Sequence, residues 1–109
     1  MIVDQRIYTL HPGKVPEWVA AMTNGGFAIQ QPVLGRCMGY YVSEFGPLNQ
    51  IVHLWGYDSL EDRAARRAEL RSIPAWNEIR DQLMPAVHHQ ENRLLLPADF
   101  AKPAAWGVR

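Results

Sequence analysis

The chain has 109 residues, the size of one domain, and 48% of them are hydrophobic. Eleven basic residues balance eleven acidic ones, so no net charge attracts nucleic acid or an anionic membrane. The single cysteine, Cys37, excludes a disulfide within the chain and favours a reducing compartment, so a cytoplasmic location is expected. The first residues do not read as a signal peptide, and no apolar run approaches the roughly 20 residues of a membrane helix.

Alternating side chains predict a first strand over residues 2–10, and both of its faces mix apolar and polar residues. We therefore expect both sides of this strand to be covered. Apolar residues at helical spacing then predict a helix over 15–23. The glycine-rich residues 24–26 predict a stop or a break. A short helical piece is expected over 27–31, ending before Pro32.

The centre of the chain predicts a β-hairpin. Two runs rich in aromatic and β-branched residues lie near 35–45 and over 50–57. Between them, residues 46–49 read Gly-Pro-Leu-Asn, which is the composition of a turn. A short connection of this kind predicts two antiparallel strands.

The register of this hairpin decides which polar side chains are neighbours. A tight turn places Glu44 opposite Ile51 and diagonal to His53. The same register places Tyr40 opposite Trp55. A slip by one residue changes all of these pairs, and the sequence leaves both registers open.

The second half of the chain predicts two more helical runs and a last strand. Asp58 or Ser59 is expected to cap the first helix, with Asp62 as the capping-box partner of Ser59. A second helical run follows over 75–84, and residues 88–96 are expected to form the fourth strand. The arginines of the helix that follows Ser59 alternate with acidic residues, which favours a solvated face over a binding stripe. They are Arg63, Arg66, Arg67 and Arg71.

The order of elements is β-α-β-β-α-β, a ferredoxin-like α+β arrangement with a four-stranded antiparallel sheet and helices on one face. We expect the domain to occupy residues 1–97. Residues 98–109 then form a C-terminal tail, in which Phe100 and Trp106 are candidates for docking on this subunit or on a partner. The other face of the sheet still carries apolar groups, so a homodimer through that face is expected.

Several short motifs lie on these elements. They are RIYTL at 6–10, PGK at 12–14, GYY at 39–41, GPLNQIVHLW at 46–55, YDSL at 57–60, DRAARR at 62–67, PAW at 74–76 and QEN at 90–92. With these motifs, the stretch from about residue 3 to 97 resembles the NIPSNAP family of the dimeric α/β-barrel superfamily. Asp4 departs from the pattern, because a Glu is expected there.

The resemblance implies a ferredoxin-like barrel and a dimer, but little about a reaction. The superfamily includes cofactor-independent monooxygenases that act on phenolic polyketides, muconolactone isomerases and haem enzymes. In these proteins the pocket lies between the sheet and the helices. The analogy holds only at the level of the fold.

Three residues are candidates for catalysis. If Glu44 orients His53, the imidazole has a pKa near neutrality and suits a general base. The alternative is a hydrogen-bonded structural histidine. Arg6 could hold a substrate carboxylate or enolate, or it could form an ion pair that ties strands together.

Other residues are candidates for ligand binding. They are Tyr8, Tyr40, Trp55, Trp76 and Asn92. A buried tyrosine can donate to a ligand oxygen or belong to the core, and Trp76 could be core or the lid of a pocket. The adjacent His88 and His89 point to opposite faces of a strand, so no metal site is expected. No cofactor is expected either, with a haem bound through His53 or His88 as the alternative.

Two functions therefore remain open. The first is a dimeric barrel that binds a small, partly aromatic molecule and performs cofactor-free oxygenation or an isomerisation begun by proton abstraction. The second is a non-catalytic interaction module whose polar residues satisfy one another. A cavity of roughly 300 Å³ or more beside His53 favours the first.

Overall fold

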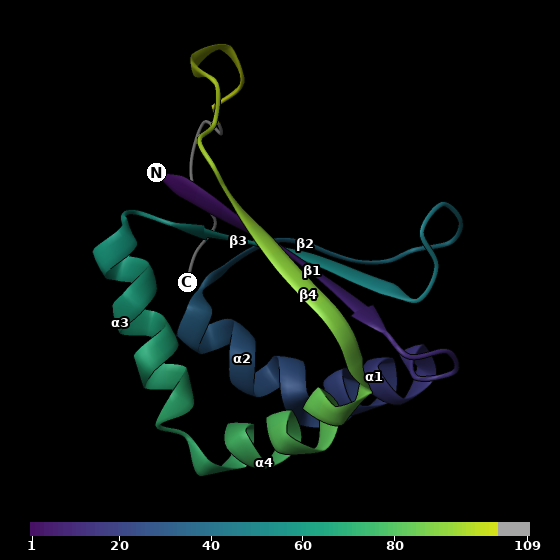
Figure 1. The fold of residues 1–109 in the computed structure, drawn as a ribbon. Helices are drawn as coiled ribbons and strands as arrows, with labels where there is room; N and C mark the ends of the chain where they lie inside the picture. The colour runs from purple at the N-terminus through teal and green to yellow at the C-terminus, as the bar shows by residue number, and fades with distance from the viewer. Residues whose placement is uncertain (103–109) are drawn as a thin grey trace.

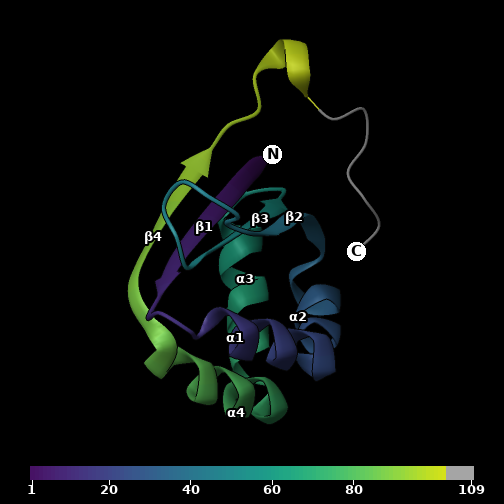
Figure 2. The same ribbon diagram turned by 90° about the vertical axis from the view of Figure 1, so that its right-hand side faces the viewer.

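In the computed structural model, which describes residues 1–102, one four-stranded sheet carries the α-helices on one face (Figures 1 and 2). The strands are β1 (Ile2–Leu10), β2 (Arg36–Val42), β3 (Gln50–Tyr57) and β4 (Val87–Leu95). Their order is β2-β3-β1-β4, and every neighbouring pair is antiparallel. The expected ferredoxin-like α+β fold is confirmed.

Four helices cover the inner face of this sheet: α1 (Val15–Ala21), α2 (Phe27–Leu34), α3 (Leu60–Arg71) and α4 (Pro74–Leu83). Short helical turns precede α2 (Met22–Gly26), follow α4 (Met84–Ala86) and follow β4 (Asp99–Ala101). In the part of the chain up to residue 102, no helix has the length and apolar character needed to cross a membrane.

The first helical segment bends where the sequence predicts a break, and Gly25 takes a φ of 145°. The predicted end before Pro32 is wrong, because α2 continues to Leu34. Leu34 is only 1% exposed, so packing against the core holds the last turn despite the proline. The Gln31 side chain donates a 2.8 Å hydrogen bond to the Gly35 carbonyl and closes the helix end.

The hairpin forms, but its register differs from the tight-turn prediction. Tyr40 pairs with His53, not with Trp55, and Val42 pairs with Ile51 in the place expected for Glu44. The connection is wider than four residues, because β2 ends at Val42. A bulge between Cys37 and Gly39 shifts the register along β2.

Glu44 therefore lies in the exposed loop at the hairpin tip, away from His53. Ser43 closes this loop by donating from its backbone N–H to the Gln50 carbonyl (3.0 Å) and from Oγ to the Pro47 carbonyl (2.6 Å). Asn49 reverses the chain at a φ of 62°. The predicted pair of Glu44 and His53 is wrong.

Helix α3 begins as the sequence predicts, with Ser59 as its N-cap. The Ser59 Oγ accepts from the Asp62 N–H at 3.0 Å. The Asp62 carboxylate accepts from the Asp58 N–H, also at 3.0 Å, instead of the Ser59 N–H that a capping box uses. Two hydrogen bonds of Asp62, one from the Asp58 backbone and one to the Ser59 side chain, thus hold the start of the helix.

The core lies between the sheet and the helices. Ile51, Trp55 and Tyr57 of β3 are fully buried there. Because side chains alternate along a strand, His53 shares this inner face and is 3% exposed. No helix among residues 1–102 covers the outer face, and Tyr41 on it is 58% exposed. Phe100 is 95% exposed and does not dock on this subunit, while Trp106 lies outside the described residues.

Candidate functional site

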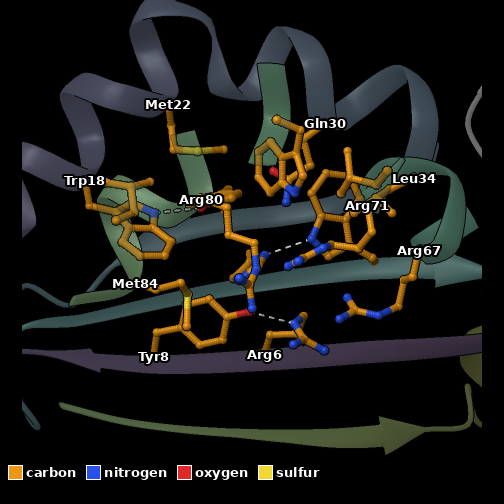
Figure 3. Close-up of a pocket in the computed structure, with 16 residues that line it drawn as sticks. Arg6, Tyr8, Trp18, Met22, Gln30, Leu34, Arg67, Arg71, Arg80 and Met84 are labelled. Atoms are coloured by element: carbon orange, nitrogen blue, oxygen red, sulfur yellow. Dashed lines mark hydrogen bonds between the residues drawn. The ribbon is translucent and has the colours of Figure 1, made fainter. Parts of the chain in front are cut away.

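A cavity of about 240 Å³ lies between the inner face of the sheet and the helices (Figure 3). Six of the eight residues proposed from the sequence line it. They are Arg6, Tyr8, Tyr40, His53, Trp55 and Trp76. Glu44 and Asn92 are not among the lining residues. The cavity is somewhat smaller than the 300 Å³ that favours a binding function, but it is a real void beside His53.

Asp4 is the hub of a buried hydrogen-bond cluster at one end of the strands. Its carboxylate accepts from Arg6 Nη1 at 3.1 Å and from Arg63 Nε at 3.0 Å. Asn92 on β4 also donates to this carboxylate, at 3.3 Å. Asn92 therefore contacts the Asp4 cluster but does not line the cavity. Burial raises the pKa of Asp4, but the guanidinium groups of Arg6 and Arg63 outweigh burial and hold this pKa below its usual value.

Arg6 connects this cluster to the cavity. While Nη1 bonds Asp4, its Nε donates to the Tyr8 hydroxyl at 3.0 Å. The ion pair with Asp4 lies within β1, and it is Arg63 that joins α3 to this strand. Arg6 is thereby oriented along the cavity floor with its side chain 13% exposed.

His53 is held by Trp55, its neighbour on the same face of β3. The indole Nε1–H of Trp55 donates to His53 Nδ1 at 2.8 Å. Because an indole nitrogen can only donate, Nδ1 must accept, and the proton of the neutral imidazole sits on Nε2. Burial, followed by the charge of Arg6, lowers the pKa of His53 to about 3.

The pKa near neutrality that was expected for His53 beside Glu44 is therefore wrong. At neutral pH, His53 presents an N–H donor. Its Nε2 is buried and has no hydrogen-bond partner within residues 1–102. The Tyr40 ring stacks on the imidazole at 4.7 Å, and the Tyr8 ring meets it edge-on at 5.1 Å. These contacts fix the ring while leaving Nε2 for a ligand.

Tyr40 is fixed from the helical side. Trp18 on α1 donates from Nε1 to the Tyr40 hydroxyl at 2.9 Å. Burial raises the pKa of Tyr40 to about 12, so the phenol keeps its proton at neutral pH. No local sequence signal points to this role of Trp18, because the role depends on the register that pairs Tyr40 with His53.

Helix α3 contributes a row of arginines that the sequence analysis assigned to solvent. Arg63, Arg67 and Arg71 are four residues apart, so they share one side of the helix. This side faces the sheet: Arg63 bonds Asp4, while Arg67 and Arg71 line the cavity. Arg66 belongs to a different side and bonds Asp62 and the Val33 carbonyl. The solvated-face prediction is wrong for Arg63 and Arg67, which are half-buried, but it holds for Arg71, which is exposed. The spacing 63, 67, 71 was the signal that these three arginines share one side of the helix.

The comparisons with known proteins agree with this architecture. The NIPSNAP family model matches residues 3–102. The chain belongs to the NIPSNAP family. An uncharacterized NIPSNAP-like domain protein from Burkholderia xenovorans, solved by crystallography, is 48% identical, with a TM-score of 0.89 over 94% of this chain and 89% of that chain. A NIPSNAP family protein from Agrobacterium tumefaciens is 44% identical, with a TM-score of 0.89 over 92% of this chain and 88% of that chain.

Among curated NIPSNAP proteins, the Protein NipSnap homolog of Dictyostelium discoideum is 37% identical over 94 residues. These residues are 86% of this chain but 41% of the relative, so the chain spans about two fifths of its length. A more distant structure, a putative antibiotic biosynthesis monooxygenase from Nitrosomonas europaea, is 15% identical, with a TM-score of 0.65 over 87% of this chain and 96% of that chain. At this identity the likeness shows the fold alone.

A haem does not fit this NIPSNAP site. Sites for drug-sized ligands occupy about 300–1,000 Å³, and this cavity is smaller. Because Trp55 donates to His53 Nδ1, the proton of the neutral ring sits on Nε2, which then has no lone pair to offer an iron. His88 is exposed on β4, where its ring lies 5.2 Å from that of His11. Within residues 1–102, no group of three or more His, Cys, Asp or Glu side chains could hold a metal ion.

Proposed function

We propose that this NIPSNAP domain binds a small, partly aromatic organic molecule in the cavity beside His53. One observation carries the proposal: on the wall of an aromatic-lined void, the buried Nε2–H of His53 has no partner among the residues that the structure describes. Leaving a buried donor unsatisfied costs about 1–3 kcal/mol. A ligand oxygen at this position removes that cost.

The walls match a flat ligand in shape and size. Aromatic side chains come from both the sheet (Tyr8, Tyr40, Trp55) and the helices (Trp18, Trp76). An apolar cavity of about 150 Å³ accepts benzene, so a void of 240 Å³ suits one substituted ring or two fused rings.

The polar groups around the cavity favour stabilising a negative oxygen over removing a proton. Arg6, the Nε2–H of His53 and the protonated Tyr40 are all donors. No Asp or Glu is among the described residues that line the cavity. An isomerisation begun by a base on the protein therefore lacks its base.

Cofactor-independent oxygenation of a ligand that is already an enolate or phenolate suits this set of donors better. The fold of the Nitrosomonas europaea protein, titled a putative antibiotic biosynthesis monooxygenase, is compatible with this choice. The alternative is a non-catalytic interaction module. It is favoured by the Asp4 cluster and the Trp18–Tyr40 bond, which satisfy one another without a ligand.

Binding is tested by calorimetry with naphthol, naphthoate and cyclohexanol as probes. We expect heat of binding with the two aromatic probes and a weaker response with the aliphatic one. His53→Phe should weaken the binding of naphthol, whereas His89→Gln, on the exposed strand β4, should leave it unchanged. If none of the three probes binds at millimolar concentration, the proposed function is rejected and the interaction module is favoured.

As part of the same proposal, a second copy covers the outer face of the sheet. Ile7 of β1 and Val52 of β3 pair there, and both are only partly buried. The outer residues of β4 include Glu91 and Arg93, charges of opposite sign that can meet their counterparts across a two-fold axis. The lone, half-buried Cys37 supports a cytoplasmic location for this homodimer.

A further inference from the structure

The cavity carries positive charge that the described residues do not neutralise. Four arginines line it: Arg6, Arg67, Arg71 and Arg80. The carboxylate of Asp4 serves Arg6 together with Arg63. Arg80 has only a 3.7 Å contact with Asp81, which is exposed. Within residues 1–102, neither Arg67 nor Arg71 makes an ion pair.

Arg67 is half-buried, as are Arg6 and Arg80, whereas Arg71 is exposed. Figure 3 shows the side chains of Arg67, Arg71 and Arg80 extending from the helices toward the space above Arg6 and Tyr8. Burial, followed by the like charges of Arg6 and Arg63, lowers the pKa of Arg67. The cavity wall thus holds guanidinium groups that repel one another, and an anion placed between them would relieve this repulsion.

We propose that the ligand is an aromatic carboxylic acid, with its carboxylate on Arg67 and Arg71 and its ring against the aromatic wall beside His53. The inference rests on the proposed function and names its ligand class. A guanidinium fork matches a planar carboxylate with two parallel hydrogen bonds. A second oxygen on the ring, as a carbonyl or phenolate, would accept from His53 Nε2, which has no partner among the described residues.

The test compares acids with neutral analogues of the same shape on the full chain. Calorimetry measures benzoate against benzamide and naphthoate against naphthamide, with acetate and inorganic phosphate as bare anions. We expect naphthoate to bind at least about tenfold more tightly than naphthamide, and added salt to weaken only the acid. Acetate and phosphate should bind much more weakly than naphthoate.

Variants of α3 assign the effect to Arg67. Arg67→Gln should lower naphthoate affinity about tenfold or more and leave naphthamide unchanged. Arg67→Lys should rescue the affinity only in part, because an ammonium keeps the charge without the fork. Arg66→Gln is the matched control on the same helix, since Arg66 bonds Asp62 and does not line the cavity. The thermal midpoint of each variant shows that it folds.

The outcomes separate the two proposals. If naphthamide binds as tightly as naphthoate, or if Arg67→Gln weakens both equally, the acid assignment is overturned while the binding function stands. If acetate or phosphate binds as tightly as naphthoate, the aromatic body is not recognised and the inference is overturned. If neither member of either pair binds, the inference is rejected, and if naphthol also fails to bind, the proposed function is rejected with it.

Discussion

Acidification should destabilise this protein through His53. The pKa of His53 falls from 6.5 to about 3 on folding, so the folded state binds fewer protons than the unfolded chain between these values. The stability from keeping the ring neutral is fully present above about pH 6.5 and is lost as pH falls toward about 3. Each pH unit in this window costs about 1.4 kcal/mol. The loss is about 2.7 kcal/mol at pH 4.5, a large share of a typical stability of about 5–15 kcal/mol.

Urea unfolding at about pH 7.5, 6.0 and 4.5 measures this loss directly. His53→Gln removes the titrating ring but keeps a side chain that can accept from Trp55. We expect the free energy of unfolding of the wild type to fall more steeply with acid, by up to about 1.4 kcal/mol per pH unit, than that of the variant. His89→Gln, on the exposed strand, should keep the wild-type slope.

Asp4 is kept out of this comparison by the choice of pH. Its pKa is lowered below 3.8 in the folded state, so its contribution is lost only at lower pH than the window used. Equal slopes for the wild type and His53→Gln would refute the reasoning. So would an NMR titration in which the His53 ring takes up a proton near pH 6.5, because a ring that accepts the Trp55 indole N–H on Nδ1 cannot also carry a proton there.

Three further predictions concern the site and the open sheet face. Asp4→Asn should lower the free energy of unfolding by about 3 kcal/mol in urea titrations, because it leaves two guanidinium groups without their carboxylate; an unchanged urea midpoint would contradict the hub role. Trp55→Phe should remove the donor that holds the His53 tautomer. The NMR shifts of the ring nitrogens should then show a mixture of the two tautomers. A ring that is still protonated only on Nε2 would mean that another group fixes the tautomer. Wild-type protein should sediment as a dimer at micromolar concentration, and Ile7→Lys on the outer face should sediment as a monomer. Glu61→Lys, on the exposed side of α3, is the control and should remain a dimer. A monomeric wild type would refute the dimer.

The order of the elements could be read from the sequence because each carries a local signal. The alternation of residues 50–57 placed His53 on the same face as Ile51 and Trp55, and the structure confirms it. The N-cap at Ser59 follows from side-chain chemistry within four residues. Such signals depend only on neighbours along the chain.

The site depended on distances that the sequence does not contain. The wider loop after Val42 changed the register and removed Glu44 from His53, although the strands themselves were predicted. Without that register, neither the stacking of Tyr40 on His53 nor the bond from Trp18 could be foreseen. The low pKa of His53 required knowledge of its burial, which is a property of the packed structure.

The corrected chemistry of His53 also limits what a reaction in this cavity could be. The polar groups of the cavity wall include donors of Arg6, His53 and Tyr40, and the carboxylate of Asp4 is already shared by Arg6 and Arg63. A substrate would therefore have to arrive with its own negative charge, or lose a proton to solvent, before the site could stabilise it. It follows that a turnover rate should depend on pH through the ionisation of the substrate. His53 would contribute by holding its Nε2–H toward the developing oxygen anion at every pH at which the fold is stable.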